Sequence, residues 1–431
     1  MDLWNATPEA FVEALHAHGA RRAYVVTQPN GQVEASHPWL ASLADAISTA
    51  PDYSGHEGAF FEVGEESGHL LSAFVHCTRR GQGAGGVRFW TYDRLGELLT
   101  DGLRLSQAMG QKCALAGLWW GGGKGVIARR PGTDHQDAGL RAAIYRDYGR
   151  FLSGLHGCYV AAEDVGTRPP DMAWIFRTTR HTTCIPPQLG GSGNPSRLTA
   201  TGVVVAMEAA LAHLGHGDLG GKTVAMQGLG NVAGFMIGDL LERGVGRIIG
   251  ADLDPGRIEE LGRRYPETPL EMRSAQPGDH SILAQQCDIL APNAVGATLN
   301  PETIPTIRAP IVCGAANNQL ADLRRDASAL AERGVLFVPD FLANRMGIVN
   351  CANEQYGVFP GDPAVHAHLD RDAPHGIWRR TLEVLELAQE RGTTPADEAV
   401  RRADELALEP HPIWPDRGRR IIEYLVQSGW A

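Results

Sequence analysis

A chain of 431 residues is long enough for two domains that each bury a full hydrophobic core. The hydrophobic content of 43% and the charged content of 21% are ordinary for globular proteins, and a formal net charge of −11 argues against nucleic acid or an acidic membrane surface as the main partner. The N-terminal stretch has neither a basic start nor an apolar run, and no stretch of about 18 apolar residues occurs, so we expect neither a signal peptide nor a membrane span.

The first part of the chain is predicted to mix helices with short strands. Residues 1–55 are expected to form a helix and irregular connections. Apolar residues at helical spacing predict a helix over 92–110, with a glycine at its end. Strands are predicted at GAFFEVG (58–64), LLSAFVH (70–76), LWWGGGKGVIA (118–128) and CYVAAED (158–164). The last two of these strands end in polar residues suited to chemistry.

A different pattern of elements begins near residue 199, with a helix predicted over 199–215. Short apolar strands separated by helix-length segments follow at KTVAMQG (222–228), GRIIGAD (246–252), CDILAP (287–292), APIVCGA (309–315) and VLFVP (335–339). This βαβ pattern is typical of a doubly wound parallel sheet. Two further helices are predicted at 376–392 and 393–406, the second with Thr394 as its N-cap.

We therefore expect an α/β protein of two domains with the active site in the cleft between them. Residues 1–199 are predicted to form an N-terminal α/β domain. Residues 200–348 are predicted to form a doubly wound domain of the Rossmann type, and 349–431 a helical segment that returns to the first domain.

The stretch GLGNVA follows a predicted strand and opens a predicted helix, which is the GxGxxA form of the dinucleotide fingerprint. Gly228 permits the tight turn, Gly230 lets a pyrophosphate approach the backbone, and Ala233 allows close packing of the helix on the strand. Asp252 stands 22 residues past Gly230 and is placed to accept hydrogen bonds from a ribose diol, which favours NAD over NADP. The candidate cofactor-binding residues here are Gly228, Gly230, Asn231, Val232, Ala233 and Asp252. A glycine turn without a ligand is the alternative, and Asp254 could replace Asp252.

Two lysines lie twelve residues apart in MGQKCALAGLWWGGGKGVI, the second behind three glycines. GGGKG lacks the spacing of a phosphate-binding loop, since Gly125 stands where the magnesium-binding hydroxyl would be. A third candidate, Asp164, ends a predicted strand before a glycine turn. Two cations and a carboxylate, Lys112, Lys124 and Asp164, suit chemistry at the α-carbon of an amino or keto acid beside a nicotinamide. The simpler alternative for either lysine alone is a solvated surface residue without a catalytic role.

The chain resembles the Glu/Leu/Phe/Val (amino-acid) dehydrogenase family, and leucine and valine dehydrogenases most closely. The resemblance rests on GAGGVRFWTYD, DGLRLSQAMGQKCALAGLWWGGGKGVI, GCYVAAEDVGT, GSGNPSRLTATGV, VAMQGLGNVA, CDILAPNAVGATLN, CGAANNQL and VPDFLANRMGIVN, which occur in family order from about residue 56. It implies a reversible oxidative deamination, in which an L-amino acid, NAD+ and water give a 2-oxo acid, ammonia and NADH.

The resemblance also implies roles for single residues. Lys112 would bind the substrate carboxylate, helped by Gly85 and Asn350. Lys124 would activate the attacking water and stabilise the carbinolamine oxygen. Asp164 would exchange protons with the substrate nitrogen.

Further positions follow from the same resemblance. The carbonyl of Gly121 would assist Asp164, and Asn317 would lie near the nicotinamide ribose. The other expected substrate-binding residues are Ala84, Met109, Ala162, Ile348 and Cys351.

The side-chain pocket points to an apolar substrate. Glutamate-specific relatives carry a lysine and a hydroxyl where this chain has Ala84 and Cys351, neither of which can pair with a carboxylate. Leucine-preferring relatives carry leucine and valine there, so the pocket is larger in this chain. A branched-chain substrate such as leucine or valine is favoured, and an aromatic one (phenylalanine or tryptophan type) is the alternative. Arg345 stands where the family usually has alanine; if it binds substrate, a polar or acidic amino acid becomes the candidate.

The seven scattered cysteines form no CxxC pair and no His/Cys cluster at metal-ligand spacing, so we expect a reduced, cytoplasmic protein without a metal site. The resemblance implies a homo-oligomer, in which residues 1–199 form the substrate and oligomerisation domain, with 1–55 as an extension beyond the usual family length, and 200–348 form the NAD-binding domain. No nucleic-acid or membrane partner is expected, and the size of the assembly and the physiological direction stay open. Two rival functions fit the sequence less well. A non-catalytic NAD-binding protein would have lost Lys112, Lys124 or Asp164, and a 2-hydroxy-acid dehydrogenase would need a histidine base beside the fingerprint.

Overall fold

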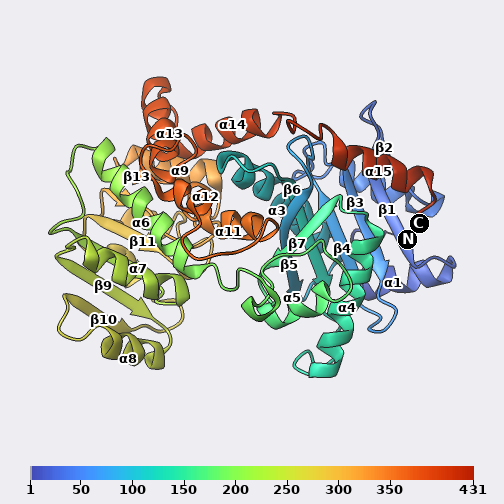
Figure 1. Ribbon diagram of the computed structural model, residues 1–431, viewed down its shortest axis with the longest axis horizontal. Coiled ribbons are helices and arrows are strands. Elements are labelled where there is room, and N and C mark those ends of the chain that lie inside the picture. The colour runs from blue at the N-terminus through green and yellow to red at the C-terminus, as the bar shows by residue number, and fades with distance from the viewer. Residues whose placement is uncertain (1) are drawn as a thin grey trace. The chain divides into compact units, whose positions relative to one another are not determined.

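The computed structural model describes residues 2–431 and contains two compact units (Figure 1). Unit 1 comprises Met1–Asn194, Cys351–Val358 and Asp404–Ala431, and unit 2 comprises Pro195–Asn350 and Phe359–Ala403. Residues 349–431 are expected from the sequence to return to the first domain as one segment. In the structure residues 351–358 and 404–431 cluster with unit 1, whereas 359–403 cluster with unit 2.

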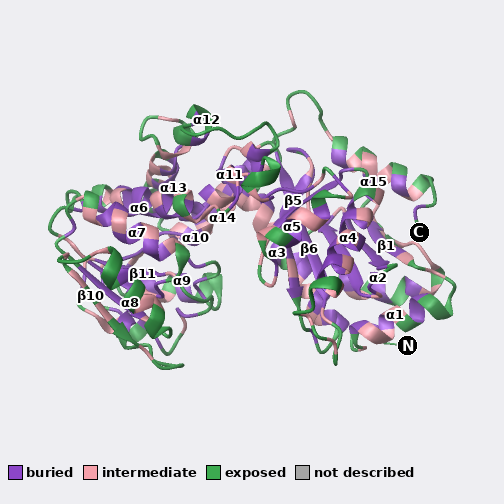
Figure 2. Cartoon of the chain, turned by 60° about the horizontal axis from the view of Figure 1, so that its bottom comes forward, coloured by how far each residue is buried: buried purple, intermediate pink, exposed green. Residues whose placement is uncertain are grey.

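Unit 1 is built on a seven-stranded mixed sheet of order β2-β1-β3-β4-β6-β5-β7. The strands are β1 (Arg22–Thr27), β2 (Val33–Ala35), β3 (Gly58–Val63), β4 (Leu70–Val75), β5 (Gly83–Trp90), β6 (Gly121–Ala128) and β7 (Tyr159–Glu163). Strand β5 lies between β6 and β7 and runs parallel to both, whereas β4 and β6 are antiparallel. All residues of β3, β4 and β6 are buried, so the middle of this sheet forms the core of the unit (Figure 2).

Helices cover both faces of this sheet. They are α1 (Pro8–Ala17), α2 (Ala41–Ser48), α3 (Leu95–Leu115), α4 (Ala138–Gly154), α5 (Pro169–Phe176) and α15 (Arg417–Gln427). A Cβ added to Gly122 would lie 2.3 Å from the Ser106 carbonyl of α3, and one added to Gly125 would lie 2.1 Å from the Tyr148 hydroxyl of α4. Because residues three apart on a strand point to opposite faces, α3 and α4 pack on opposite sides of β6.

The N-terminal region differs from the expectation. Residues 22–35 form β1 and β2 rather than an irregular connection, and β1 pairs antiparallel with β3. The reason is visible in the stretch RAYVVT, where Ala23, Val25 and Val26 are buried in a β-branched segment that suits a strand paired on both sides. Phe11 of α1 is fully buried and its ring packs edge-on against Phe61 with 5.5 Å between centroids. The first 55 residues are therefore part of the core of unit 1.

Unit 2 carries the doubly wound sheet that the sequence predicts. Its six strands have the order β10-β9-β8-β11-β12-β13, and every neighbouring pair is parallel. They are β8 (Thr223–Gln227), β9 (Arg247–Asp252), β10 (Leu270–Ser274), β11 (Ile289–Pro292), β12 (Ile311–Val312) and β13 (Leu336–Phe337); β10 was not predicted. The helices are α6 (Ser196–His213), α7 (Asn231–Glu242), α8 (Pro255–Arg264), α9 (Leu323–Glu332), α10 (Asp340–Ala343), α12 (Pro363–His366) and α13 (Ile377–Arg391).

Two of the four points where the chain passes between the units lie within helices, namely α11 (Met346–Glu354) and α14 (Pro395–Ala407). As predicted, α13 ends at Gly392, whose φ of 64° is left-handed, and Thr394 caps α14 by accepting from the Asp397 N–H at 3.1 Å. Helix α13 packs on α6, where a Cβ at Gly202 would lie 2.7 Å from Ile377, and this contact explains why 359–403 belong to unit 2. Among the described residues, no helix is both long and apolar enough to cross a membrane.

Candidate active site

Lys124 of β6 and Asp164, which directly follows β7, form an ion pair. These strands are not neighbours, because β5 lies between them, and side chains two strands apart start about 10 Å from each other. The contact is possible because β5 has no side chain at Gly86, where a Cβ would lie 2.5 Å from the Cβ of Asp164. The missing side chain at Gly86 therefore leaves the space over β5 through which the Asp164 carboxylate reaches the Lys124 ammonium group.

The charges around Asp164 decide its ionisation. Burial alone raises the pKa of this carboxyl group, but the charge and hydrogen bond of Lys124 and the charge of Arg88 outweigh it, so the pKa is lowered overall. Lys124 is 4% exposed, so the pair lies in a largely desolvated place where electrostatic interactions are strong. The site holds an ionised carboxylate beside an amine, which is suited to moving protons.

Arg88 extends this cluster toward α3. One of its terminal nitrogens donates to Asp101 Oδ2 at 2.7 Å, and the same oxygen accepts from the Tyr92 hydroxyl at 2.9 Å. Arg104 pairs with the other oxygen of Asp101 at 3.1 Å. Burial and the neighbouring Asp101 raise the pKa of the Tyr92 phenol, which therefore stays a hydrogen-bond donor.

The glycines around Lys124 are packed against protein. A Cβ at Gly122 would lie 3.1 Å from the α-carbon of Gly110 in α3, and one at Gly123 would lie 2.6 Å from the Tyr159 ring. Together with the approach of Gly125 to Tyr148, these contacts let α3, α4 and β7 close tightly around β6. The glycines of GGGKG thus allow the neighbouring elements to pack closely enough to bury the Lys124 side chain.

Glu163, the residue before Asp164, is also perturbed. Burial and the nearby carboxylates of Asp171 and Asp164 raise the pKa of Glu163 from 4.5 to about 7. Asp171 itself is buried and ion-paired with Arg141 at 2.5 Å. A carboxyl group that titrates near neutral pH therefore adjoins the Lys124–Asp164 pair.

The other expected substrate positions of unit 1 lie near the same strands. Lys112 is in the last turn of α3, which Gly110 anchors on β6. Gly85 lies beside Met109, since a Cβ there would be 3.1 Å from the Met109 side chain and 1.9 Å from the Gly123 carbonyl oxygen. Only glycine fits at that position.

Three small residues and a cysteine complete this group. Ala84 of β5 and Ala162 of β7 are buried, and a Cβ at Gly121 would lie 2.1 Å from the Cys77 carbonyl oxygen. Cys351 on α11 is buried against Cys184, with 2.7 Å between the two sulfur atoms. Among the residues that the structure describes, no group of three or more His, Cys, Asp or Glu side chains is arranged to hold a metal ion.

The expected dinucleotide loop is the connection between β8 and α7 in unit 2. Gly228 has a left-handed φ of 86°, and a Cβ there would lie 2.6 Å from Ala294, so this tight turn requires glycine. Gly230 is exposed and a Cβ on it would meet no atom within 4 Å, which leaves room for a ligand at the N-terminus of α7. Asn231 and Val232 form the first turn of that helix, whose N–H groups favour phosphate. Ala233 is buried, as close packing on the strand requires.

Asp252 ends β9 beside this loop. Its carboxylate accepts from the Leu229 N–H at 2.6 Å and from the Asp254 N–H at 2.9 Å. Asp254 instead caps α8 by accepting from the Gly256 N–H at 2.8 Å. The structure therefore brings Asp252, and not Asp254, to the glycine loop. Arg257 holds the loop from outside by donating to the carbonyl oxygens of Leu229 at 2.7 Å and Gly230 at 3.1 Å.

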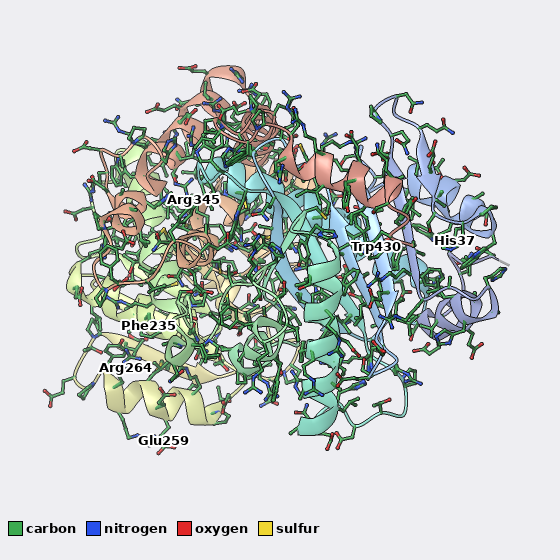
Figure 3. All side chains as sticks on the ribbon, turned by 45° about the vertical axis from the view of Figure 1, so that its right-hand side comes forward. His37, Phe235, Glu259, Arg264, Arg345 and Trp430 are labelled. Atoms are coloured by element: carbon green, nitrogen blue, oxygen red, sulfur yellow. The ribbon has the colours of Figure 1, made fainter. Side chains whose placement is uncertain are left out.

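The late part of unit 2 carries the remaining predicted residues. Asn317 is exposed and accepts from the Asn344 amide at 2.8 Å, and Ile348 and Asn350 lie on α11. Arg345, labelled in Figure 3, has no exposed surface and donates to the carbonyl oxygen of His375 within the same unit. Burial and the charge of Arg380 lower the pKa of Arg345 to about 9. Its guanidinium group is therefore engaged inside unit 2.

Sequence reasoning missed Gly86 and Arg88 in unit 1 and Arg257 in unit 2. Gly86 and Arg88 stand in the quoted stretch GAGGVRFW, and residues two apart on a strand share a face, so the spacing could have placed both near Asp164. The composition also points to the candidate site, because the chain has only three lysines, at 112, 124 and 222, among 39 lysine and arginine residues. Two of the three therefore fall in the candidate site.

Comparison with known proteins gives matches over most of the chain. Residues 61–181 match the model of the Glu/Leu/Phe/Val dehydrogenase dimerisation domain, and residues 190–255 and 256–402 match that of Glutamate/Leucine/Phenylalanine/Valine dehydrogenase. Leucine dehydrogenase of Bacillus subtilis (strain 168) is 38% identical over 375 residues, covering 87% of this chain and 95% of that protein. Valine dehydrogenase of Streptomyces albus is 36% identical over 85% of this chain and 96% of that protein. The crystal structure of L-tryptophan dehydrogenase from Nostoc punctiforme has a TM-score of 0.67 and 31% identity, covering 82% of this chain and 96% of that one.

Proposed function

The chain belongs to the Glu/Leu/Phe/Val dehydrogenase family, and from this premise we propose that it catalyses the reversible oxidative deamination of a branched-chain L-amino acid such as leucine or valine. It is an NAD-dependent amino-acid dehydrogenase. The amino acid, NAD+ and water give the 2-oxo acid, ammonia and NADH. The observation that carries the proposal is the Lys124–Asp164 ion pair, which reaches across β5 at Gly86.

When held at the glycine loop of unit 2 by Gly228, Gly230 and Asp252, NAD+ would supply the hydride acceptor for the reaction. Lys112 binds the substrate carboxylate together with Gly85 and Asn350. Lys124 activates water for attack on the α-carbon and stabilises the oxygen of the resulting carbinolamine. Asp164 takes and returns protons at the substrate nitrogen; its lowered pKa keeps it ready to accept one.

The Gly121 carbonyl is proposed to assist Asp164 by accepting a hydrogen bond from the substrate nitrogen. On the cofactor side, the pyrophosphate would lie at Gly230 and the first turn of α7, where space is open. Asp252 would bind the ribose diol with its remaining lone pairs, and Asn317 would contact the nicotinamide ribose. Gly228, Asn231, Val232 and Ala233 shape this loop.

The proposed side-chain pocket consists of small or apolar residues, namely Ala84, Met109, Ala162, Ile348 and Cys351. None of them can pair with a distal carboxylate, which supports an apolar substrate. Ala84 and Cys351 leave more room than leucine and valine would, and the similarity to L-tryptophan dehydrogenase also favours an aromatic amino acid as second candidate. Arg345 does not favour an acidic substrate, since its guanidinium group donates to His375 inside unit 2.

We propose a homo-oligomer that assembles through unit 1, because residues 61–181 match a dimerisation domain. The seven cysteines are all free thiols, which suits a reducing cytoplasm. Light scattering of the purified protein would give the size of the assembly.

The test is turnover of a panel of L-amino acids with NAD+, followed by the absorbance of NADH. We expect leucine and valine to give the highest kcat/KM, phenylalanine and tryptophan less, and glutamate none. A higher kcat/KM for phenylalanine or tryptophan would make an aromatic amino acid the preferred substrate. No turnover with any apolar amino acid would show that the proposed substrate class is wrong.

A further inference from the structure

Two cysteines from distant parts of the chain meet inside unit 1. Cys184 lies in the connection between α5 and α6, and Cys351 lies on α11, 167 residues later. Their sulfur atoms are 2.7 Å apart, and the side chains are 2% and 4% exposed. A disulfide bond is about 2.05 Å long, so a small displacement would bring the two sulfurs to bonding distance.

The backbone holds this pair in place. Cys184 has a left-handed φ of 60°, a conformation that favours glycine, so surrounding contacts must keep the cysteine in it. Glu354 provides them from one turn further along α11: its carboxylate accepts from the N–H groups of Cys184 at 3.0 Å and Ser192 at 2.7 Å, and from the Ser192 hydroxyl at 2.6 Å. The helix that carries Cys351 thus also fixes the backbone of Cys184.

We propose that Cys184 and Cys351 form an oxidation site, at which a peroxide converts the two thiols into an intramolecular disulfide. Cys184 attacks the peroxide, becomes a sulfenic acid and releases water. The sulfur of Cys351 then attacks that of Cys184, and the second oxygen leaves as water with the remaining thiol proton. The two thiols lose two electrons in total and hydrogen peroxide gains them.

The surroundings allow such an oxidant to approach. Thr182, Ile185 and Glu354, which are neighbours of the cysteine pair, line an open cavity of about 460 Å³. The pKa of the Cys351 thiol is raised well above its usual range by its hydrogen bond with Cys184 and by burial. Thr182 and Ile185, which flank Cys184 in the chain, line this cavity, so the first attack is assigned to Cys184.

The consequence for catalysis rests on the proposed function, in which Cys351 lines the substrate pocket. A disulfide would shift the Cys351 side chain, which is proposed to contact the substrate, and would link α11 covalently to the 182–192 connection. A change of this size is comparable to adding or removing a methylene group in a hydrophobic pocket, so we expect about a tenfold change in kcat/KM for the branched-chain substrate. The effect should appear mainly in KM.

The experiment treats the full-length protein with hydrogen peroxide and counts free thiols after denaturation. We expect the count to fall from seven to five and to return to seven with dithiothreitol. Peptide mapping should find one linked pair, Cys184 with Cys351. An unchanged count, a different linked pair, or sulfinic acid on Cys184 without a link would overturn the proposal.

Two variants make the result specific. C184G suits the left-handed backbone and should keep all of its six thiols under peroxide. C313A removes another buried thiol, in unit 2, and should fall from six to four. Because thiol counting needs no turnover, an inactive protein that still forms the link would contradict the proposed function and leave the oxidation site standing. If C184G loses activity under peroxide to the same extent as the natural protein, the loss is caused by oxidation of other residues and not by the Cys184–Cys351 disulfide.

Discussion

Nε of Arg88 lies 3.5 Å from Oδ2 of Asp164, the same carboxylate oxygen that contacts the ammonium group of Lys124. Asp164 therefore has two cations on one side. Arg88 is itself held by Asp101, which also binds Tyr92 and Arg104, so its position is fixed by the start of α3. We conclude that Arg88 is a positioning residue, which keeps Asp164 ionised and directed at Lys124.

Replacing Arg88 should alter the pH dependence of the reaction. Arg88 lowers the pKa of Asp164, so R88L should raise that pKa and move the acidic limb of the kcat profile to higher pH. We expect kcat to fall about 10- to 100-fold, the scale of one general-acid or general-base contribution, with little change in KM. R88K retains the charge and should recover most of the profile. A uniform fall in kcat with an unchanged pH profile would contradict this role.

Lys124 can be tested against the other lysines of the chain. K124A should abolish turnover, because it removes the group proposed to activate water, while binding of NAD+ to unit 2 should change little. Binding is measured by the quenching of protein fluorescence and folding by circular dichroism. K222A is the matched control, since Lys222 lies next to β8 and outside the Lys124–Asp164 cluster, and it should retain turnover. Substantial activity in K124A would show that its proposed role is wrong.

Glu163 should give the protein a pH-dependent stability near neutrality. Its pKa in the folded state is about 7 against an ordinary value of 4.5, so between these values the folded state binds a proton that the unfolded state lacks. Stability is therefore lost as the pH rises through this window. E163Q removes the charge at similar size, and we expect it to gain about 1 kcal/mol over the natural protein at pH 8, after allowance for solvent screening, and little at pH 5. Urea unfolding at both pH values measures this; equal differences at the two would contradict it.

The fold could be predicted, and candidate site residues could be proposed, because both leave local patterns in the sequence. The parallel sheet of unit 2 shows as short apolar runs, and Gly228, Gly230 and Asp252 have a spacing that only one loop geometry explains. Pairing between distant strands leaves no such pattern. The order β6-β5-β7, which places Gly86 between Lys124 and Asp164, follows from tertiary packing, and the partner of Cys351 lies 167 residues away. Strand β1, which pairs with β3, and the short edge strand β2 were missed for the same reason.

The acid at the end of β9 should decide cofactor selection. Asp252 adjoins the glycine loop, whereas Asp254 caps α8, so D252N should raise the KM for NAD+ and D254N should not. The expected rise is about tenfold, the loss of one charge-assisted hydrogen bond to the ribose diol. D252N should also reduce the preference for NAD+ over NADP+, because the Asp252 carboxylate no longer repels the 2′-phosphate of NADP+. An equal effect of both variants would indicate that Asp252 acts only on the loop.

The size of the proposed substrate pocket is set at Ala84, which is 1% exposed and lies opposite Gly122 and Val160 in the sheet. A84L would fill space that larger side chains need, so turnover of phenylalanine and tryptophan should fall more than that of valine. One methylene in such a pocket changes kcat/KM by about 10- to 200-fold, and we expect the ratio of valine to tryptophan turnover to rise by that order. C351V probes the second position and should act in the same direction. Overpacking also costs stability, so thermal unfolding of each variant is compared with the natural protein. Equal losses for all substrates would mean that Ala84 supports the sheet and does not face the substrate side chain.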